Sequence, residues 1–247
     1  MGVARMYRPR SFLYPCRMRW TALFLLAMLS GAHAAPCNPL QFDGSRFTVC
    51  ALDAKKQNLR LVLPASRSFA GISGQGVAFG MNAGMFDGSG QPIGLYVENG
   101  KTLHAINTES GSGNFYMLPN GVFSQDANGR LHIDTTQAFV ARHANPRWAT
   151  QSGPMLLIAG SLHPMVSDDG PSRNIRNGVC VKDASHAFFA ISEDAISFGK
   201  LARLFRDDLK CRDALYLDGF VSSLWIPSGA RMDNRAPLGP VVLATGH

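Results

Sequence analysis

Residues 94–105 read GLYVENGKTLHA, in which Asn99-Gly100 separates two short strand-like segments. Asn-Gly favours a tight hairpin because both central residues of that turn need positive φ. A second pair, Asn128-Gly129, separates the apolar residues 121–123 from residues 131–133. The two hairpins predict antiparallel strand pairing in the first half of the chain.

Apolar segments of strand length continue on both sides of these hairpins. They fall at residues 47–52, 59–63, 77–81, 155–158, 186–191, 214–217 and 241–244. One helix is expected from Ser197, which can cap it, through Lys210, and its apolar face comprises Leu201, Leu204, Phe205 and Leu209. Hairpin-linked strands with a few helices predict a single domain with an α+β fold, or an α/β fold with a mixed sheet.

The N-terminus has the three parts of a secretory signal peptide. Residues 1–19 hold five arginines and no acidic residue, residues 20–29 are an apolar run, and Ala32-His33-Ala34 is a small-x-small cleavage site. The run is about half of the ~20 residues that a membrane span needs, which disfavours the alternative of an uncleaved anchor. We therefore expect residues 1–34 to be removed, and residues 35–247 to be periplasmic or secreted without stable membrane insertion.

The chain without this leader is nearly neutral and has the size of one domain. Removal of 34 of the 247 residues leaves 213, which suits a single full-sized core. Loss of the five leader arginines lowers the net charge from +7 to +2. The remaining sequence has no Lys/Arg stripe with interleaved aromatic residues, so it does not predict binding to nucleic acid.

The cysteines agree with export to an oxidising compartment. Cys16 lies in the leader, and Cys37, Cys50, Cys180 and Cys211 remain, which allow three pairings. We favour Cys37–Cys50, which fixes the new N-terminus, and Cys180–Cys211, which joins two core segments. The competing interpretation is a metal site, but the sequence has no C-x-x-C and no histidine at ligand spacing. No metal or other cofactor is therefore predicted.

Polar, glycine-containing segments adjoin four of the apolar strands. The first, residues 82–88, directly follows residues 77–81. It places Asn82 at a strand end, includes Gly84, which permits a sharp turn or a close approach to a ligand, and adds the carboxylate of Asp87. The alternative is an ordinary turn with an asparagine cap.

The other three segments carry groups suited to binding or acid–base chemistry. Gln151 and Ser152 can donate hydrogen bonds to an oxyanion or a sugar hydroxyl, or can simply form a turn. Arg176 can grip a phosphate with its planar fork, although most arginines are solvated surface charges. Asp218 ends an apolar strand and can act as an acid, a base or a nucleophile, or can cap a turn before Gly219. The sequence has no G-x-S-x-G elbow, G-x-G-x-x-G opening a helix, or P-loop spacing, so the common esterase, dehydrogenase and kinase interpretations lack support.

The order of these four segments resembles the phosphodiester glycosidase family. The resemblance rests on N-A-G-M-F at residues 82–86, Q-S-G-P-M-L at 151–156, R-N-G-V at 176–179 and L-D-G-F-V-S at 217–222. It implies hydrolysis of the bond between a sugar's anomeric carbon and a phosphodiester oxygen, on a carbohydrate or sugar-phosphodiester substrate. By this resemblance the catalytic residues are Asp218, Arg176 and Asn82, and the substrate-binding residues are Gly84, Asp87, Gln151, Ser152, Asn177, Gly219 and Ser222. Phe220 stands where the animal members have a second glycine, so its ring is expected to narrow the pocket or stack on a sugar.

The implied mechanism needs little acid assistance, because a phosphate monoester is a good leaving group. Arg176 would neutralise the phosphate, and Asp218 would stabilise the oxocarbenium-like centre or activate water, with Asp87 as a second candidate. Glu193 and Asp194 are further acids that the sequence does not rank. Two rival functions remain: a metal-dependent phosphodiesterase with Asp87 and Asp218 as ligands, and a non-catalytic periplasmic glycan-binding module.

Overall fold

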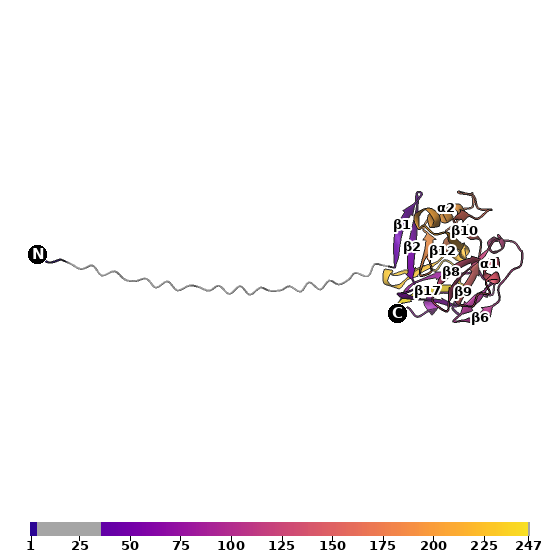
Figure 1. The fold of residues 1–247 in the computed structure, drawn as a ribbon, viewed down its shortest axis with the longest axis horizontal. Helices are drawn as coiled ribbons and strands as arrows, with labels where there is room; N and C mark the ends of the chain where they lie inside the picture. Colours follow the sequence, from indigo (N-terminus) through magenta and orange to yellow (C-terminus); the bar gives the residue numbers. More distant parts are fainter. Residues whose placement is uncertain (4–35, 247) are drawn as a thin grey trace. The chain divides into compact units, whose positions relative to one another are not determined.

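The structure is a computed structural model that describes residues 1–3 and 36–246 (Figure 1). The described residues from Pro36 onward belong to one compact unit, Ala35–His247. Nearly all of the expected leader, residues 1–34, lies outside the described residues, so the signal peptide stays a prediction. Within the described part of the chain, no helix is long and apolar enough to cross a membrane.

The largest sheet has seven strands, and all of its neighbours pair antiparallel. Its order is β1 (Cys37–Phe42), β2 (Ser45–Asp53), β13 (His186–Ser192), β12 (Asn177–Asp183), β14 (Asp213–Tyr216), β10 (Met155–Ile158) and β11 (Ser161–Leu162). Segments far apart in the sequence thus lie side by side, as β2 and β13 do.

Two five-stranded antiparallel sheets complete the β structure. One has the order β16 (Arg231–Met232), β15 (Leu224–Ile226), β4 (Val77–Asn82), β17 (Val241–Gly246) and β3 (Gln57–Val62). The other has the order β6 (Lys101–His104), β5 (Tyr96–Glu98), β9 (Pro146–Ser152), β7 (Gly121–Asp126) and β8 (Leu131–Thr135). The fold is therefore mostly β, which corrects the α+β and α/β expectations, although the prediction of hairpin-linked strands with few helices is confirmed.

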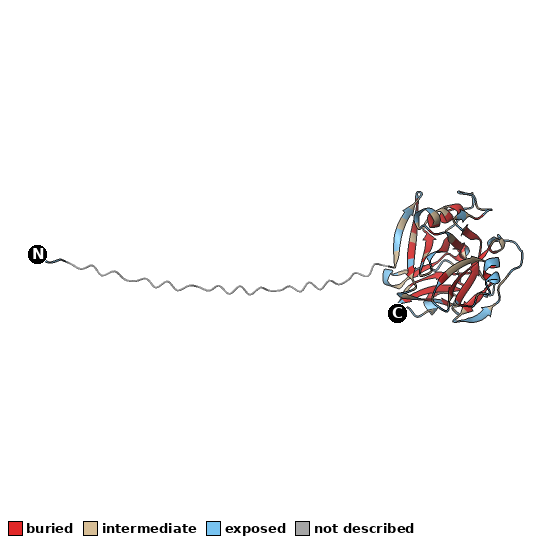
Figure 2. Cartoon of the chain, in the orientation of Figure 1, coloured by how far each residue is buried: buried red, intermediate tan, exposed pale blue. Residues whose placement is uncertain are grey.

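The three sheets share one apolar core. The Phe189 ring of β13 lies 5.5 Å from the Phe79 ring of β4 and 5.5 Å from the Phe123 ring of β7, measured between ring centroids. All three side chains are buried, and buried strand segments run through the interior of the molecule (Figure 2). Burial of each ring stabilises the fold by roughly 2–3 kcal/mol, so the contact of three rings joins the sheets strongly.

Both predicted hairpins form, but with different turns. Asn99 and Gly100 both have positive φ, 46° and 80°, as the Asn-Gly rule requires. At the second hairpin Gly129 is the member of the pair with positive φ. There the Asp126 carboxylate accepts the amides of Asn128 and Arg130 at 2.9 and 2.8 Å, so a side chain organises the turn.

Residues 36–246 form two α-helices, and both are short. The first, α1 (Thr136–Ala141), is not predicted by the sequence pattern. The second, α2 (Phe198–Arg203), begins as predicted, because the Ser197 hydroxyl accepts the Lys200 amide at 3.0 Å. It continues as a π-helical turn, Leu204–Asp208, rather than as an α-helix to Lys210, and Leu209 donates to the Leu204 carbonyl at 3.1 Å. Four 3-10 turns also occur among the described residues, at η1 (Phe69–Gly71), η2 (Asn114–Tyr116), η4 (Gly219–Val221) and η5 (Pro227–Gly229).

Both predicted disulfides are present. Cys37 of β1 bonds Cys50 of β2, its direct partner in the strand register. Cys180 of β12 bonds Cys211, which lies just before β14. The second bond therefore joins the two adjacent strands that lead to the candidate site described next.

Candidate functional site

Asp218 lines a pocket of about 420 Å³ at the end of β14, here called the Asp218 pocket. It is lined by residues 85–88 and 112–116, by Asp218, Phe220 and Val221, and by two further side chains, Arg67 and Ile93. Of the residues that the sequence proposed for the site, Asp218 and Asp87 face this pocket. Phe220, whose ring is 92% exposed, stands at its rim.

The Asp218 carboxylate is unusual for its lack of a charged partner. Its Oδ1 accepts the Phe220 amide at 3.3 Å, and no cation of the described chain forms an ion pair with it. Burial raises the pKa of Asp218 to about 6, because desolvation penalises the ionised form more than the one hydrogen bond favours it. A carboxylate with a raised pKa that lines a pocket is a candidate acid, base or nucleophile.

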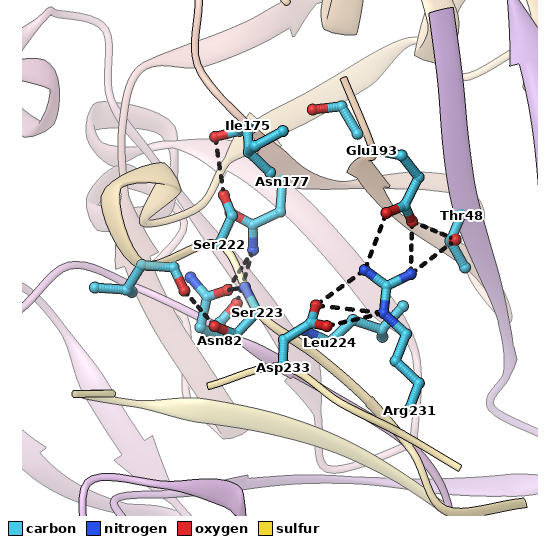
Figure 3. Close-up of polar contacts among 12 residues, drawn as sticks. Thr48, Asn82, Ile175, Asn177, Glu193, Ser222, Ser223, Leu224, Arg231 and Asp233 are labelled. Carbon is cyan, nitrogen blue, oxygen red and sulfur yellow. Dashed lines mark hydrogen bonds and ion pairs between the residues drawn. The ribbon is translucent and has the colours of Figure 1, made fainter. Parts of the chain in front are cut away.

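A buried amide network holds the main chain at Asp218, and Figure 3 shows its members Asn82, Asn177, Ser222 and Ser223. Asn82, at the end of β4, donates to the Asp218 carbonyl at 2.7 Å and accepts the Ser223 amide at 2.8 Å. Asn177, at the start of β12, donates to Asn82 Oδ1 at 2.9 Å. The Ser222 hydroxyl lies 3.2 Å from Asn177 Oδ1 and 3.2 Å from the Ile175 carbonyl. Strand ends distant in sequence are thus tied to one loop.

The roles expected for Asn82, Asn177 and Ser222 in the reaction stay predictions, and the hydrogen bonds of these side chains in the structure are to other parts of the protein. All three side chains are buried and make several hydrogen bonds within the protein, and none lines the Asp218 pocket. The sequence prediction brought the right residues together, but the structure gives them the position of a support beneath Asp218. Buried polar groups that are fully paired in this way hold a unique geometry.

Arg176 also lies behind the site rather than in it. Its guanidinium is buried against the Phe198 ring, 3.6 Å from the ring centroid. Arg176 does not line the Asp218 pocket. It donates to the Ile196 carbonyl at 2.9 Å, to the Tyr216 hydroxyl at 3.2 Å and to Ser172 Oγ at 3.0 Å. Burial lowers its pKa from the ordinary value of arginine. That Arg176 binds the substrate phosphate stays a prediction, and its hydrogen bonds in the structure are to the protein itself.

Gly219 connects Arg176 to the Asp218 loop. A Cβ atom on Gly219 would overlap the Tyr216 hydroxyl, which Arg176 holds in place from the other side. Burial raises the pKa of Tyr216 to about 12, so it stays a neutral phenol. A glycine is needed at this position for close packing, and its predicted substrate-binding role is not supported by a pocket contact.

Gln151 and Gly84 are likewise structural in their contacts. Gln151 is buried at the end of β9; its Oε1 accepts the amides of Leu95 and Asn107, both at 2.9 Å, and its Nε2 donates to the Asn107 carbonyl at 2.7 Å. A Cβ on Gly84 would overlap the Gln151 carbonyl, so this glycine serves a close approach of two chain segments. The buried Ser152 hydroxyl has no hydrogen-bond partner within the described residues.

Asp87 also faces the pocket, and one oxygen of its carboxylate accepts hydrogen bonds from its own loop. Its Oδ1 accepts the Ser89 amide at 2.8 Å, the Ser89 hydroxyl at 2.6 Å and the Gln91 amide at 3.0 Å. The hydrogen bonds from Ser89, with those from Gln91, hold the pKa of Asp87 below its ordinary value. Asp87 therefore shapes a loop of the pocket, and Asp218 is the more available carboxylate.

Sequence reasoning missed Arg67, which brings a guanidinium to the Asp218 pocket. Arg67 has a left-handed backbone, with φ of 51°, which is uncommon for a residue with a Cβ. Its Nε donates to the Leu238 carbonyl at 3.4 Å, its Nη1 to the Gly88 carbonyl at 3.5 Å, and its guanidinium lies 5.2 Å from the centroid of the Phe86 ring. These contacts hold the side chain in place yet leave its charge without a carboxylate partner in the described structure.

The unranked acids Glu193 and Asp194 are both ion-paired outside the pocket. Glu193 accepts from Arg231 at 2.5 Å and from the Thr48 hydroxyl at 2.7 Å (Figure 3). Asp194 is bound by Arg46, which lowers the pKa of the carboxyl to about 2. Across residues 36–246 no group of three or more His, Cys, Asp or Glu side chains is placed to hold a metal ion.

Known proteins resemble this chain in sequence and in fold. The sequence signature of the phosphodiester glycosidase family matches residues 75–240. The Escherichia coli protein YigE, described as uncharacterized, is 37% identical over 171 residues, which is 68% of this chain and 66% of YigE. The chain therefore spans just under two thirds of that relative.

Two solved structures share the fold at low sequence identity. The catalytic domain of zebrafish N-acetylglucosamine-1-phosphodiester alpha-N-acetylglucosaminidase, auto-inhibited by its pro-peptide, matches with a TM-score of 0.60 and 12% identity, over 85% of this chain and 81% of that one. A hypothetical protein from Synechocystis matches with a TM-score of 0.53 and 14% identity, over 85% of this chain and 61% of that one. From the signature across residues 75–240, the chain belongs to the phosphodiester glycosidase family of enzymes.

Proposed function

We propose that the protein hydrolyses the bond between the anomeric carbon of a sugar and a phosphodiester oxygen, in the Asp218 pocket. The observation that carries this proposal is that one pocket contains two groups of opposite charge, neither of which forms an ion pair within residues 36–246. They are Asp218, with its raised pKa, and the guanidinium of Arg67. A glycosidic bond to phosphate needs a carboxylate at the sugar and a cation at the phosphate. We place the reaction in the periplasm or outside the cell, in cell-envelope or exopolysaccharide metabolism.

In the proposed reaction, ionised Asp218 acts on the sugar side. It takes a proton from a water molecule, whose oxygen forms a bond to the anomeric carbon. The bond from that carbon to the phosphate oxygen breaks, and its electron pair stays with the phosphate, which leaves as a monoester. Arg67 neutralises the charge that develops on this leaving group, so no strong acid is needed.

The pH dependence of the rate tests the charge state assigned to Asp218. Because the ionised carboxylate does the work, kcat/KM should rise as the pH rises through about 6, the pKa of Asp218. A rate that instead falls above this pH would assign Asp218 the role of a proton donor.

The position of bond cleavage tests the function itself. The purified protein is incubated in ¹⁸O water with a methyl phosphodiester of N-acetylglucosamine 1-phosphate, the sugar in the name of the zebrafish protein. The proposal predicts free sugar with ¹⁸O at the anomeric carbon. Release of sugar 1-phosphate with ¹⁸O in the phosphate, lost after treatment with a chelator, would indicate a metal-dependent phosphodiesterase instead. Binding of the compound without any turnover would indicate a glycan-binding module.

A further inference from the structure

A second hollow, of about 550 Å³, adjoins the Asp218 pocket and shares Arg67 with it. Two short segments form its walls, residues 66–68 and residues 234–237. We call it the Arg235 hollow. Arg67 lines both hollows, whereas Asp218 lines only the first.

The walls of the Arg235 hollow carry positive charge and no negative charge. Arg67 and Arg235 supply two guanidinium groups and Asn234 supplies an amide, whereas the Ser66 hydroxyl donates to the Ser68 carbonyl and the Ser68 hydroxyl accepts the Ala70 amide. Neither arginine forms an ion pair anywhere in the described part of the chain. A concave surface of this composition attracts an anion rather than a neutral group.

The nearest acid in sequence does not compensate this charge. Asp233 lies two residues before Arg235, but its carboxylate accepts from Arg231 at 2.9 Å and from the Leu224 amide at 3.0 Å. Asp233 is therefore neutralised in another cluster and does not line the hollow.

The two walls are fixed to each other through Arg67. The Leu238 amide donates to the Arg67 carbonyl at 2.8 Å, and Arg67 Nε donates back to the Leu238 carbonyl at 3.4 Å. The left-handed backbone of Arg67 belongs to this arrangement. A non-glycine residue held in that conformation costs free energy, and such outliers gather at functional sites.

We infer that the Arg235 hollow binds a second phosphate group, on the leaving-group side of the scissile bond. This inference rests on the proposed function, which places the scissile phosphate at Arg67 and the sugar at Asp218. The leaving group then extends past Arg67 toward Arg235. The preferred substrates are sugars joined to a pyrophosphate or to a chain of repeating phosphodiesters, rather than sugars joined to a phosphodiester of a neutral alcohol.

Three substrates with the same sugar test this inference by turnover. They are the methyl phosphodiester of N-acetylglucosamine 1-phosphate, with one phosphate; UDP-N-acetylglucosamine, with a pyrophosphate; and a synthetic dimer of N-acetylglucosamine 1-phosphate, with two separate phosphates. Because a hydrogen bond to a charged group is lost, Arg235→Gln should raise KM about tenfold for a two-phosphate substrate and leave the methyl ester within about twofold. Whichever two-phosphate substrate responds identifies the source of the second phosphate.

A matched control and a binding measurement separate this inference from the proposed function. Arg130→Gln removes an exposed arginine that lines neither hollow, so it should leave all three KM values unchanged. By calorimetry, inorganic pyrophosphate should bind the wild-type protein more tightly than inorganic phosphate does, and Arg235→Gln should abolish the difference. This readout needs no turnover, so it stands even if none of the three compounds is cleaved. Equal effects of Arg235→Gln on one-phosphate and two-phosphate ligands, or no effect on either, would overturn the inference.

Discussion

Two sites with acidic side chains differ in how the negative charge is balanced. In the Arg231 cluster, Glu193 and Asp233 share one guanidinium and are neutralised by it (Figure 3). In the Asp218 pocket, a carboxylate of similar burial has a single backbone hydrogen bond and a pKa raised to about 6. Burying a charge is costly unless it is paired. The comparison shows that this fold can provide a cation for a partly buried carboxylate. The absence of such a cation at Asp218 within the described chain therefore suggests a role for this carboxylate in a reaction rather than in stability.

The largest expected effect is on Asp218, the carboxylate proposed to act in the reaction. Asp218→Asn keeps the shape of the side chain and an oxygen that can accept the Phe220 amide, but it removes the negative charge. It should lower turnover of a sugar phosphodiester by roughly a thousandfold or more. Turnover is measured as release of free sugar, beside a melting curve that confirms folding. Near wild-type turnover would end the catalytic assignment of Asp218.

The paired cluster should show the reverse pattern. Arg231→Met leaves Glu193 and Asp233 facing each other without a cation, and should lower the free energy of unfolding by roughly 2–4 kcal/mol. Turnover at a temperature where the variant is folded should change little. Arg46→Met is the control, because it breaks an ion pair of an arginine whose side chain is 65% exposed and should affect denaturant unfolding far less. A loss of turnover without loss of stability would place the Arg231 cluster in the reaction.

Arg67→Lys separates charge from shape at the pocket. Lysine keeps a positive charge but lacks the planar fork, so kcat/KM should fall by roughly a hundredfold. Arg130→Lys, on an exposed arginine outside the pocket, should leave kcat/KM unchanged. If Arg67→Lys is as active as the wild type, the phosphate is bound by some other group.

The smallest effect is a change in stability with pH. The pKa of Asp218 is about 6 in the folded protein, above the ordinary value of 3.8, so the wild-type protein loses stability as the pH rises between these values. Asp218→Asn removes this loss, and at pH 7 it should be more stable than the wild type by roughly 1–3 kcal/mol, allowing for partial exposure. The difference should vanish at pH 4 in denaturant unfolding. Asp183→Asn should act in the opposite direction, because hydrogen bonds from Ser185 and His186 lower the pKa of Asp183.

Features that depend on neighbouring residues, such as hairpin turns and helix caps, were predicted from the sequence better than features that depend on contacts between distant segments. The Asn-Gly hairpins and the Ser197 cap were predicted because each depends on residues within a few positions of one another. Strand β9 escaped prediction because it begins with a proline and is buried at nearly every position, which removes the alternation that reveals a half-exposed strand.

The site divides in the same way. Asp218 was identifiable, because an aspartate after a wholly apolar strand stands out in the sequence. The contact of Arg176 with the Phe198 ring was not predicted, because neighbouring residues do not reveal whether an arginine faces a pocket or an aromatic ring in the interior. Arg67 was missed, because its position depends on a contact with Leu238, 171 residues away in the chain.

The Cys180–Cys211 bond holds β12 to the chain that leads into β14, away from the ends of these strands that carry Asn177 and Asp218. Strands β12 and β14 run antiparallel, and the bond lies at the end remote from Asn177 and Asp218. From Cys180 to Asn177 the chain advances roughly 10 Å. A small shift of one strand against the other at the disulfide therefore also displaces Asn177 relative to Asp218. We therefore expect the spacing of Asn177 and Asp218 to depend on a disulfide that lies outside the Asp218 pocket. We expect protein made in a reducing cytoplasm to lack this disulfide and to hold Asn177 and Asp218 less rigidly. Its specific activity should then be lower than that of the oxidised protein.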